Sequence, residues 1–134
     1  MTKPLENRLA LVTGASRGIG AETAVALGRA GAHVILTGRT EGGLVEVEER
    51  IHQAGGTASI APLDLLNGDH IDGLAQHVAE RWGRLDILVL NAGQLGPLSP
   101  LSHVPPKDWE KVIGVNLTAS YRLIRAFDLL LRQS

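Results

Sequence analysis

The eight residues Thr13–Gly20, TGASRGIG, contain three glycines and begin at the last residue of the apolar run LALVT, residues 9–13. Residues 18–30 have a helical pattern, so the glycines lie in a turn between a predicted strand and a predicted helix. Such a turn lets the backbone approach a pyrophosphate closely, and the helix N-terminus presents free N–H groups and a partial positive charge. Glycines also mark ordinary turns, but the order of strand, loop and helix favours a phosphate-binding loop.

Apolar runs alternate with helical patterns along the rest of the chain. Four runs have the length and continuity of strands buried on both faces, as in a parallel sheet: residues 9–13, 33–38, 57–62 and 85–91. Between them, apolar residues recur three or four positions apart, at 44, 47, 51 and 54 and again at 71, 74, 78 and 82. Gly31, Gly55 and Gly83 follow the first three helices, where helix stops belong.

A last helix is predicted over roughly residues 107–132. Its mostly apolar stripe consists of Leu117, Tyr121, Ile124, Asp128 and Leu131. The order of strands and helices requires right-handed crossovers, which predicts an α/β fold with a doubly wound parallel sheet and helices on both faces. We expect one domain over residues 1–134. Ligands bind beyond the carboxyl ends of the strands in such folds, and the loop 93–106 lies at that edge.

The composition argues against several other classes of protein. The net charge is −1, and the only aromatic residues are two tryptophans, one tyrosine and one phenylalanine, so we expect no nucleic-acid partner. The sequence shows no signal peptide and no run of about 18 apolar residues, so we expect no membrane partner. The absence of cysteine is compatible with a reducing compartment, and we expect a cytoplasmic protein.

The five histidines do not predict a metal site. They lie at positions 33, 52, 70, 77 and 103, and only His70 and His77 share a predicted helix. Seven helical residues separate these two by about 10.5 Å along the axis, which is too far for them to ligate one ion. We expect no metal, and we expect the histidine side chains to face solvent.

The glycine spacing leads to a family resemblance. Gly14-x-x-x-Gly18-x-Gly20, preceded by Thr13, differs from the common G-x-G-x-x-G pattern and resembles the T-G-x-x-x-G-x-G motif of the short-chain dehydrogenases/reductases. The resemblance extends along the whole chain. It implies a Rossmann-type sheet with its first four strands in the order 3-2-1-4.

Three further motifs support the same resemblance. The tripeptide Asn91-Ala92-Gly93 ends the fourth strand, and the segment PLDL places Asp64 just after the third strand, where the family contacts the adenine ring. The segment VIGVNLTASY brings Asn116 to the position of the asparagine in the family's catalytic helix. In the family, the backbone carbonyl of that asparagine lies at a helix kink and holds a water of the proton relay. The alternative for Asn116 is a local hydrogen bond within its helix.

The end of the second strand bears on the cofactor. Members that bind NAD place an acidic residue there for the ribose 2′-hydroxyl, whereas this chain has Gly38 followed by Arg39. A guanidinium can hold a 2′-phosphate with charge-assisted hydrogen bonds, and Arg17 resembles the second basic residue of NADP-preferring members. We therefore expect NADP rather than NAD, although both arginines could instead be solvated surface charges. The residues expected to contact the cofactor are Thr13, Gly14, Ser16, Arg17, Gly18, Ile19, Gly20, Arg39, Asp64, Leu65, Asn91, Ala92 and Gly93.

The catalytic chemistry of the family is only partly represented. The family transfers a hydride between nicotinamide and a carbonyl or alcohol carbon, with Tyr-x-x-x-Lys and an upstream serine handling the proton. The only tyrosine, Tyr121, is followed four residues later by Arg125, which cannot relay a proton. We assign Tyr121 to packing on a helix face. Asn116 is then the only catalytic residue that the resemblance carries over.

The resemblance therefore implies the cofactor-binding half of an NADP(H)-dependent oxidoreductase for a small carbonyl or alcohol substrate, inactive in this form. The alternative is a non-catalytic nucleotide-binding module or a truncated chain that acts only in binding. The fourth strand would be an apolar edge open to pairing. The resemblance also implies a homo-oligomer formed through the helix that follows this strand.

Overall fold

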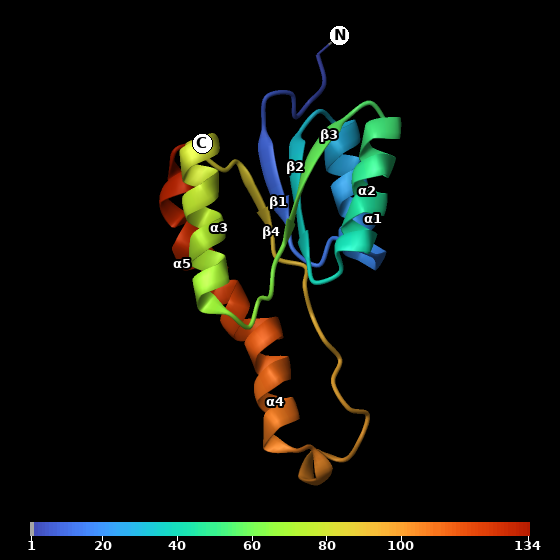
Figure 1. The fold of residues 1–134 in the computed structure, drawn as a ribbon, viewed down its shortest axis with the longest axis vertical. Helices are drawn as coiled ribbons and strands as arrows, with labels where there is room; N and C mark the ends of the chain where they lie inside the picture. Colours follow the sequence, from blue (N-terminus) through green and yellow to red (C-terminus); the bar gives the residue numbers. More distant parts are fainter. Residues whose placement is uncertain (1) are drawn as a thin grey trace.

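The computed structural model describes residues 2–134 and contains one parallel sheet (Figure 1). Its strands are β1 (Leu9–Val12), β2 (His33–Gly38), β3 (Thr57–Pro62) and β4 (Ile87–Val89). The spatial order is β3-β2-β1-β4, which confirms the predicted Rossmann-type topology. β4 is shorter at both ends than the predicted run of residues 85–91, and the Leu85 amide donates to the Leu130 carbonyl, outside the sheet.

Helices cover both faces of the sheet. α1 (Gly18–Arg29) and α2 (Glu41–Gln53) lie on one face, and α3 (Gly68–Arg81) and α5 (Ala119–Arg132) lie on the other. Successive strand side chains point to opposite faces, so Ala10 and Val12 enter the α1/α2 core while Leu9 and Leu11 enter the α3/α5 core. The predicted helix stops are confirmed by positive φ angles of 110° at Gly31, 87° at Gly55 and 74° at Gly83.

The predicted last helix is divided into three parts. α4 (Pro106–Ile113) continues into one π-helical segment, Gly114–Thr118, before α5 begins. The buried residues of this stretch are Val115, Ala119, Leu123 and Phe127, four apart. The face that enters the core is therefore not the predicted apolar stripe.

The side chains of that stripe lie mainly on the surface. Leu117, Tyr121 and Ile124 are 64%, 59% and 51% exposed, whereas Leu131 is partly buried against the α3/α5 core. Tyr121 thus does not pack into the core. The same stretch of sequence contains a second apolar stripe, the buried residues named above, and this second stripe is the one that packs into the core.

The loop after β4, a short 3-10 turn (Leu101–His103) and α4 form an arm that projects from the sheet (Figure 1). α4 has no buried residue. The arm is held together partly by the loop backbone at Gly96, because a Cβ there would lie 2.7 Å from Val112 Cγ2. No helix within residues 2–134 is long and apolar enough to cross a membrane.

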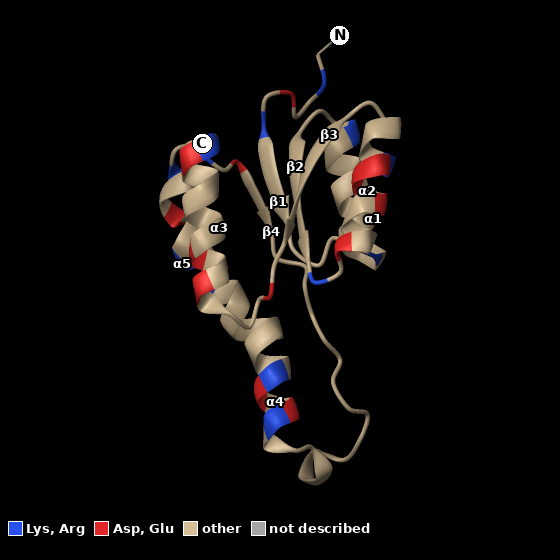
Figure 2. Ribbon diagram, viewed as in Figure 1, with Lys and Arg blue, Asp and Glu red and all other residues tan. Residues whose placement is uncertain are grey.

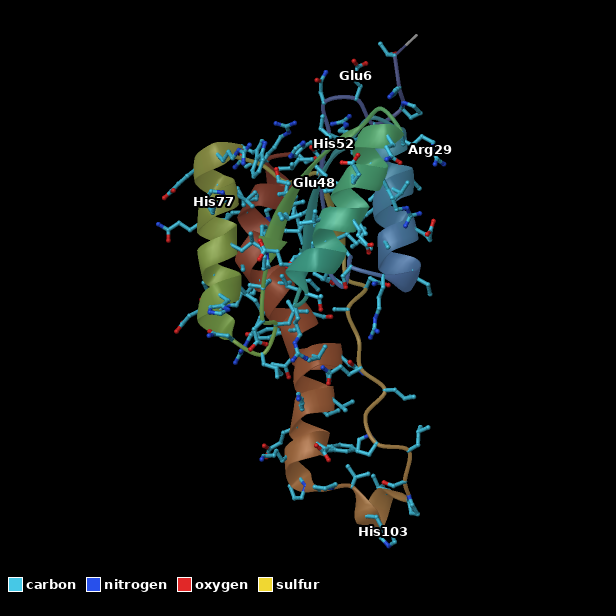
Figure 3. All side chains as sticks on the ribbon, turned by 45° about the vertical axis from the view of Figure 1, so that its right-hand side comes forward. Glu6, Arg29, Glu48, His52, His77 and His103 are labelled. Carbon is cyan, nitrogen blue, oxygen red and sulfur yellow. The ribbon has the colours of Figure 1, made fainter. Side chains whose placement is uncertain are left out.

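His33 corrects the expectation that all five histidines face solvent. Its ring nitrogens Nδ1 and Nε2 lie 2.8 Å from Thr57 Oγ1 and Ser59 Oγ, respectively, and its ring centroid is 5.7 Å from that of Trp82. Strand pairing places Thr57 opposite His33, which is why β3 supplies the hydroxyls. Burial, and then the positive charge of Arg81, lower the pKa of His33. Figure 3 shows His52, His77 and His103 on three separate elements, and residues 2–134 contain no cluster of three metal-ligating side chains.

Asp86 anchors the opposite end of the sheet from the glycine turn. Its Oδ2 accepts from the Leu9 amide at 2.7 Å and from Arg84 Nε at 3.2 Å, and its Oδ1 accepts from Ser134 Oγ at 2.8 Å. Burial acts to raise the pKa of Asp86, but these hydrogen bonds and the Arg84 charge outweigh it and lower the pKa below its ordinary value. The carboxylate therefore ties β1, β4 and the end of α5 together.

Candidate functional site

The glycine turn is shaped by contacts that only glycine allows. Gly14 and Gly18 have φ angles of 61° and 60°, in the region that residues with a Cβ rarely adopt. A Cβ on Gly20 would overlap the Gly14 carbonyl oxygen and approach Asn91 Nδ2, so Gly20 allows α1 to begin directly against the turn. A Cβ on Gly18 would meet nothing within 4 Å, which leaves the surface of the turn open beside α1.

Thr13 and Asn91 lock the turn to the end of β4. Thr13 Oγ1 accepts from the backbone amides of Asn91 and Ala92, and Asn91 Nδ2 donates to the carbonyls of Thr13 and Gly14, each at 3.2 Å. Because these bonds join positions 78 residues apart, the NAG tripeptide is held against the glycine turn by the fold itself.

A cavity of about 840 Å³ lies over the carboxyl ends of the strands. Its volume falls in the range of small-molecule and cofactor sites. Its walls come from the segments that follow all four strands. Eleven of the residues predicted to contact the cofactor line it: Gly14, Ser16, Arg17, Gly18, Ile19, Arg39, Asp64, Leu65, Asn91, Ala92 and Gly93.

The other two predicted contact residues lie beneath the cavity wall. Thr13 is 1% exposed and acts through the Asn91 and Ala92 amides, and Gly20 is buried against Gly14. Both support the turn rather than form its open surface. Their place in the motif is therefore explained by packing and hydrogen bonding within the protein.

The α1 N-terminus is suited to an anion. Arg17, at the N-cap position, makes no side-chain capping bond, and the first turn contains no acidic residue. By contrast, α3 is capped by Asn67 and has Asp69 in its first turn. The first amides of α1 thus lack a side-chain acceptor, and the helix dipole adds a partial positive charge beside the glycine turn.

Arg17 lies within this turn and Arg39 directly follows β2, whereas the first carboxylate after β2, that of Glu41, does not line the cavity. Arg17 and Arg39 are exposed and line the same cavity, and Gly38 occupies the position where a carboxylate would face a ribose. Asp64 lies farther along the sheet, after β3, and its Oδ1 accepts from the Leu66 amide at 3.0 Å. The cavity therefore has a cationic rim near the end of β2.

Besides Gly38, whose position the sequence analysis had singled out, the cavity is lined by six residues that sequence reasoning missed: Thr37, Thr40, Gly43, Leu63, Gln94 and Val115. Among residues 2–134, Thr37 Oγ1 is the buried side-chain polar atom without a hydrogen-bond partner. Thr40 precedes α2, yet its hydroxyl makes no capping bond to that helix. Thr37 is a polar residue at the carboxyl end of the apolar strand HVILTG, and this position was the sequence signal that could have assigned it to the cavity.

Asn116 lies behind the NAG wall rather than on the cavity surface. Its Oδ1 accepts from the Gln94 amide at 2.7 Å, and its Nδ2 donates to the Gln94 carbonyl at 2.8 Å. This side chain does not bond locally within its helix, which removes the alternative given above. Asn116 lies within the π-helical segment Gly114–Thr118.

The open turn, the uncapped helix, the cationic rim and the orphaned Thr37 hydroxyl fit a phosphate-bearing dinucleotide. The fold and the residues of this site are those of the short-chain dehydrogenase class. The family model for short chain dehydrogenase matches residues 8–134, and the chain belongs to this family.

Similar proteins come from bacteria and from a metagenome. The uncharacterized oxidoreductase YciK of Escherichia coli (strain K12) is 41% identical over 133 residues, which are 97% of this chain and 53% of the relative. A crystal structure of a metagenomic short-chain oxidoreductase in complex with NADP is 46% identical with a TM-score of 0.90, covering 92% of this chain and 56% of that one.

A further solved structure is a short-chain dehydrogenase from Shigella flexneri 2a complexed with NADP. It is 39% identical, has a TM-score of 0.91 and covers 100% of this chain and 57% of that chain. The chain thus spans about half the length of the relatives that it matches.

Proposed function

We propose that this chain is the NADP(H)-binding half of an oxidoreductase that interconverts a carbonyl and an alcohol. The observation that carries the proposal is the convergence of Arg17 and Arg39 on one cavity, with Gly38 in place of a carboxylate. A carboxylate there would repel a 2′-phosphate, whereas guanidinium groups bind phosphate oxygens through charge-assisted hydrogen bonds. The NADP complexes of the two relatives support the same choice.

Each segment of the cavity has a role in holding the cofactor. Arg39 and Arg17 would bind the 2′-phosphate, and the open turn around Gly18 together with the α1 N-terminus would bind the pyrophosphate. Asp64 and Leu65 would contact the adenine, and the NAG tripeptide would form the wall beside the nicotinamide. When bound, NADP(H) supplies or accepts the hydride.

Asn116 is proposed as a positioning residue and as part of the proton relay. Its side chain fixes the backbone of Gln94, the residue that continues the NAG wall. Its backbone carbonyl lies in a π-helical segment, where the regular hydrogen-bond pattern of a helix is interrupted. That interruption supports a carbonyl available to a water.

We propose that the chain by itself does not turn over substrate. The lysines are Lys3, Lys107 and Lys111, and none stands four residues after Tyr121. A phenol with an ordinary pKa of about 10 needs a neighbouring ammonium group to exchange protons near neutral pH. A non-catalytic nucleotide-binding module remains the second candidate.

Binding calorimetry tests the cofactor choice. We expect NADP+ to bind at least about tenfold more tightly than NAD+, and Arg39→Ala to remove that preference by weakening NADP+ alone. Arg29→Ala is a matched control, because Figure 3 shows Arg29 at the end of α1 far from the glycine turn. Equal affinities of the unmodified chain for the two cofactors would contradict the proposal.

Nicotinamide absorbance tests turnover. NADPH mixed with the chain and a panel of simple ketones should show no oxidation above the rate without protein. Measurable oxidation would contradict the role given to the missing Tyr-x-x-x-Lys pair. Both candidate functions, the oxidoreductase and the non-catalytic nucleotide-binding module, predict that the chain binds NADP+ without turnover. Adding the remaining half of a family member as a separate chain distinguishes them, because restored turnover would favour the oxidoreductase.

A further inference from the structure

The cavity has two chemically different ends. The strand order β3-β2-β1-β4 places Asp64 and Arg39, which follow β3 and β2, on one side, and Asn91–Gln94, which follow β4, on the other. If Arg39 holds the 2′-phosphate, the adenosine occupies the β2/β3 side and the nicotinamide extends toward β4. A substrate that exchanges a hydride must therefore lie next to Gln94.

Gln94 is also where the projecting arm begins. The arm consists of residues 94–113, that is, the loop 94–105 and α4, and it leaves the fold at this end of the cavity (Figure 1). The Asn116 side chain forms hydrogen bonds with both the backbone amide and the backbone carbonyl of Gln94, so the first residue of the arm is fixed relative to the cavity wall. The chemistry of the loop therefore decides what approaches the nicotinamide end from this side.

The loop exposes several leucines and contains no fully ionised side chain. Residues 94–106 contain no Lys, Arg, Asp or Glu, and Figure 2 shows the loop without coloured charges, whereas α4 has both signs. Leu95, Leu98 and Leu101 are 80%, 85% and 74% exposed. Several large apolar side chains exposed on one short segment indicate a binding surface.

We propose that the substrate is a ketone or alcohol with an apolar, uncharged body, bound against the loop leucines with Leu95 as a specificity-determining residue. The proposal rests on the NADP(H)-dependent oxidoreductase function given above. A carboxylate or phosphate near the carbonyl of the substrate would lose hydration beside these leucines. The loop contains no Lys or Arg to compensate for that loss, and its one basic residue, His103, lies at the tip of the arm. The cationic groups Arg17 and Arg39 lie toward the other end, where the cofactor uses them.

The test compares two ketones of similar size, acetophenone and the anion benzoylformate. Each is titrated into the NADP+-loaded chain, and binding is followed by saturation-transfer NMR on the ligand. We expect acetophenone to bind at least about tenfold more tightly than benzoylformate. Leu95→Gln should weaken acetophenone binding about threefold or more, with little effect on NADP+. Leu129→Gln, which alters an exposed leucine on α5, should leave both affinities unchanged.

The outcomes separate this proposal from the one on which it rests. If calorimetry detects no NADP+ binding, the proposed function fails, and this inference fails with it. If NADP+ binds but benzoylformate binds as tightly as acetophenone, or Leu95→Gln and Leu129→Gln have equal effects, only the substrate class is overturned. Self-association that Leu98→Gln abolishes, without any acetophenone binding, would assign the loop to protein contact and also overturn it.

Discussion

The hydroxyl of Thr13 accepts hydrogen bonds from the backbone amides of both Asn91 and Ala92, each at 3.0 Å. One side chain on β1's end therefore satisfies two consecutive amides that follow β4. This arrangement gives the first residue of the glycine motif a structural task that is separate from contact with a cofactor.

We predict that Thr13→Val destabilises the protein by about 1–3 kcal/mol, because valine keeps the shape but leaves two partly buried amides without an acceptor. Thr13→Ser, which keeps the hydroxyl, should recover most of this loss. Urea unfolding followed by circular dichroism measures both. Equal stability of the Val and Ser variants would show that these bonds do not stabilise the fold.

Gly20→Ala should disrupt the glycine turn. The added Cβ would overlap the Gly14 carbonyl oxygen, so either the turn or α1 must move, and NADP+ affinity should fall by at least about tenfold. Gly42→Ala is the matched control, because a Cβ on that α2 residue meets nothing within 4 Å and helix propensity favours alanine. Calorimetric titration of both variants with NADP+ checks this prediction, and unchanged binding by Gly20→Ala would refute it.

Stability should decrease in mild acid because of His33. Burial and Arg81 lower its pKa below the ordinary 6.5, so the folded state favours the neutral ring and the unfolded chain binds the proton first. The contribution of the neutral His33 ring to the free energy of unfolding is complete at pH values above its ordinary pKa. This contribution is lost as the pH falls toward the lower pKa of His33 in the folded state. Asp86 does not contribute in this window, because its own pKa is lowered from 3.8.

Urea midpoints between about pH 8 and about pH 5 measure this effect. His33→Gln should flatten the profile, whereas His103→Gln, at the tip of the arm, should retain it. Arg81 is the charged group that acts on His33, and His77 lies near the Trp82 ring that His33 also contacts, with ring centroids 6.4 Å apart. The pH profile of a His77→Gln variant therefore distinguishes the effect of His77 on stability from the effect of His33. An unaltered profile in His33→Gln would exclude His33 as the titrating group.

The exposed stripe of α5 should form a contact between copies of the chain. Tyr121 and Ile124 remain more than half exposed on a helix whose opposite face is fully used in the core. Ile124→Glu should therefore weaken self-association at least about tenfold, and Leu129→Glu, elsewhere on the same helix, should not. Sedimentation at several concentrations measures this difference. A chain that stays monomeric at every concentration would contradict the predicted oligomer.

Much of the fold follows from local patterns. The strand runs, the positive-φ glycines and the glycine spacing depend on interactions close in sequence, and the topology then follows from the handedness of crossovers. The same holds for the cavity, because parallel strands bring their carboxyl ends to one edge. Arg39, Asp64 and Asn91 could thus be assigned to one cavity without coordinates.

The rest depends on long-range packing. The face with Ala119, Leu123 and Phe127 became the core face because α5 packs with it against α3 and the sheet, which the apolar pattern of α5 alone does not determine. The His33 hydroxyl contacts depend on the register between β2 and β3, and the Asn116 bonds join residues 22 apart. Periodicity within one segment contains no information about such pairings.

The short strand β4 has one further consequence. It pairs with β1 alone, through Ile87, Leu88 and Val89, and its other edge makes no ladder within residues 2–134. The same strand leads directly into Asn91 and the cavity wall. Fluctuations of a strand held by one ladder must therefore reach that wall. Any strand that pairs with the free edge should dampen these fluctuations, and by linkage cofactor binding should in turn strengthen the pairing.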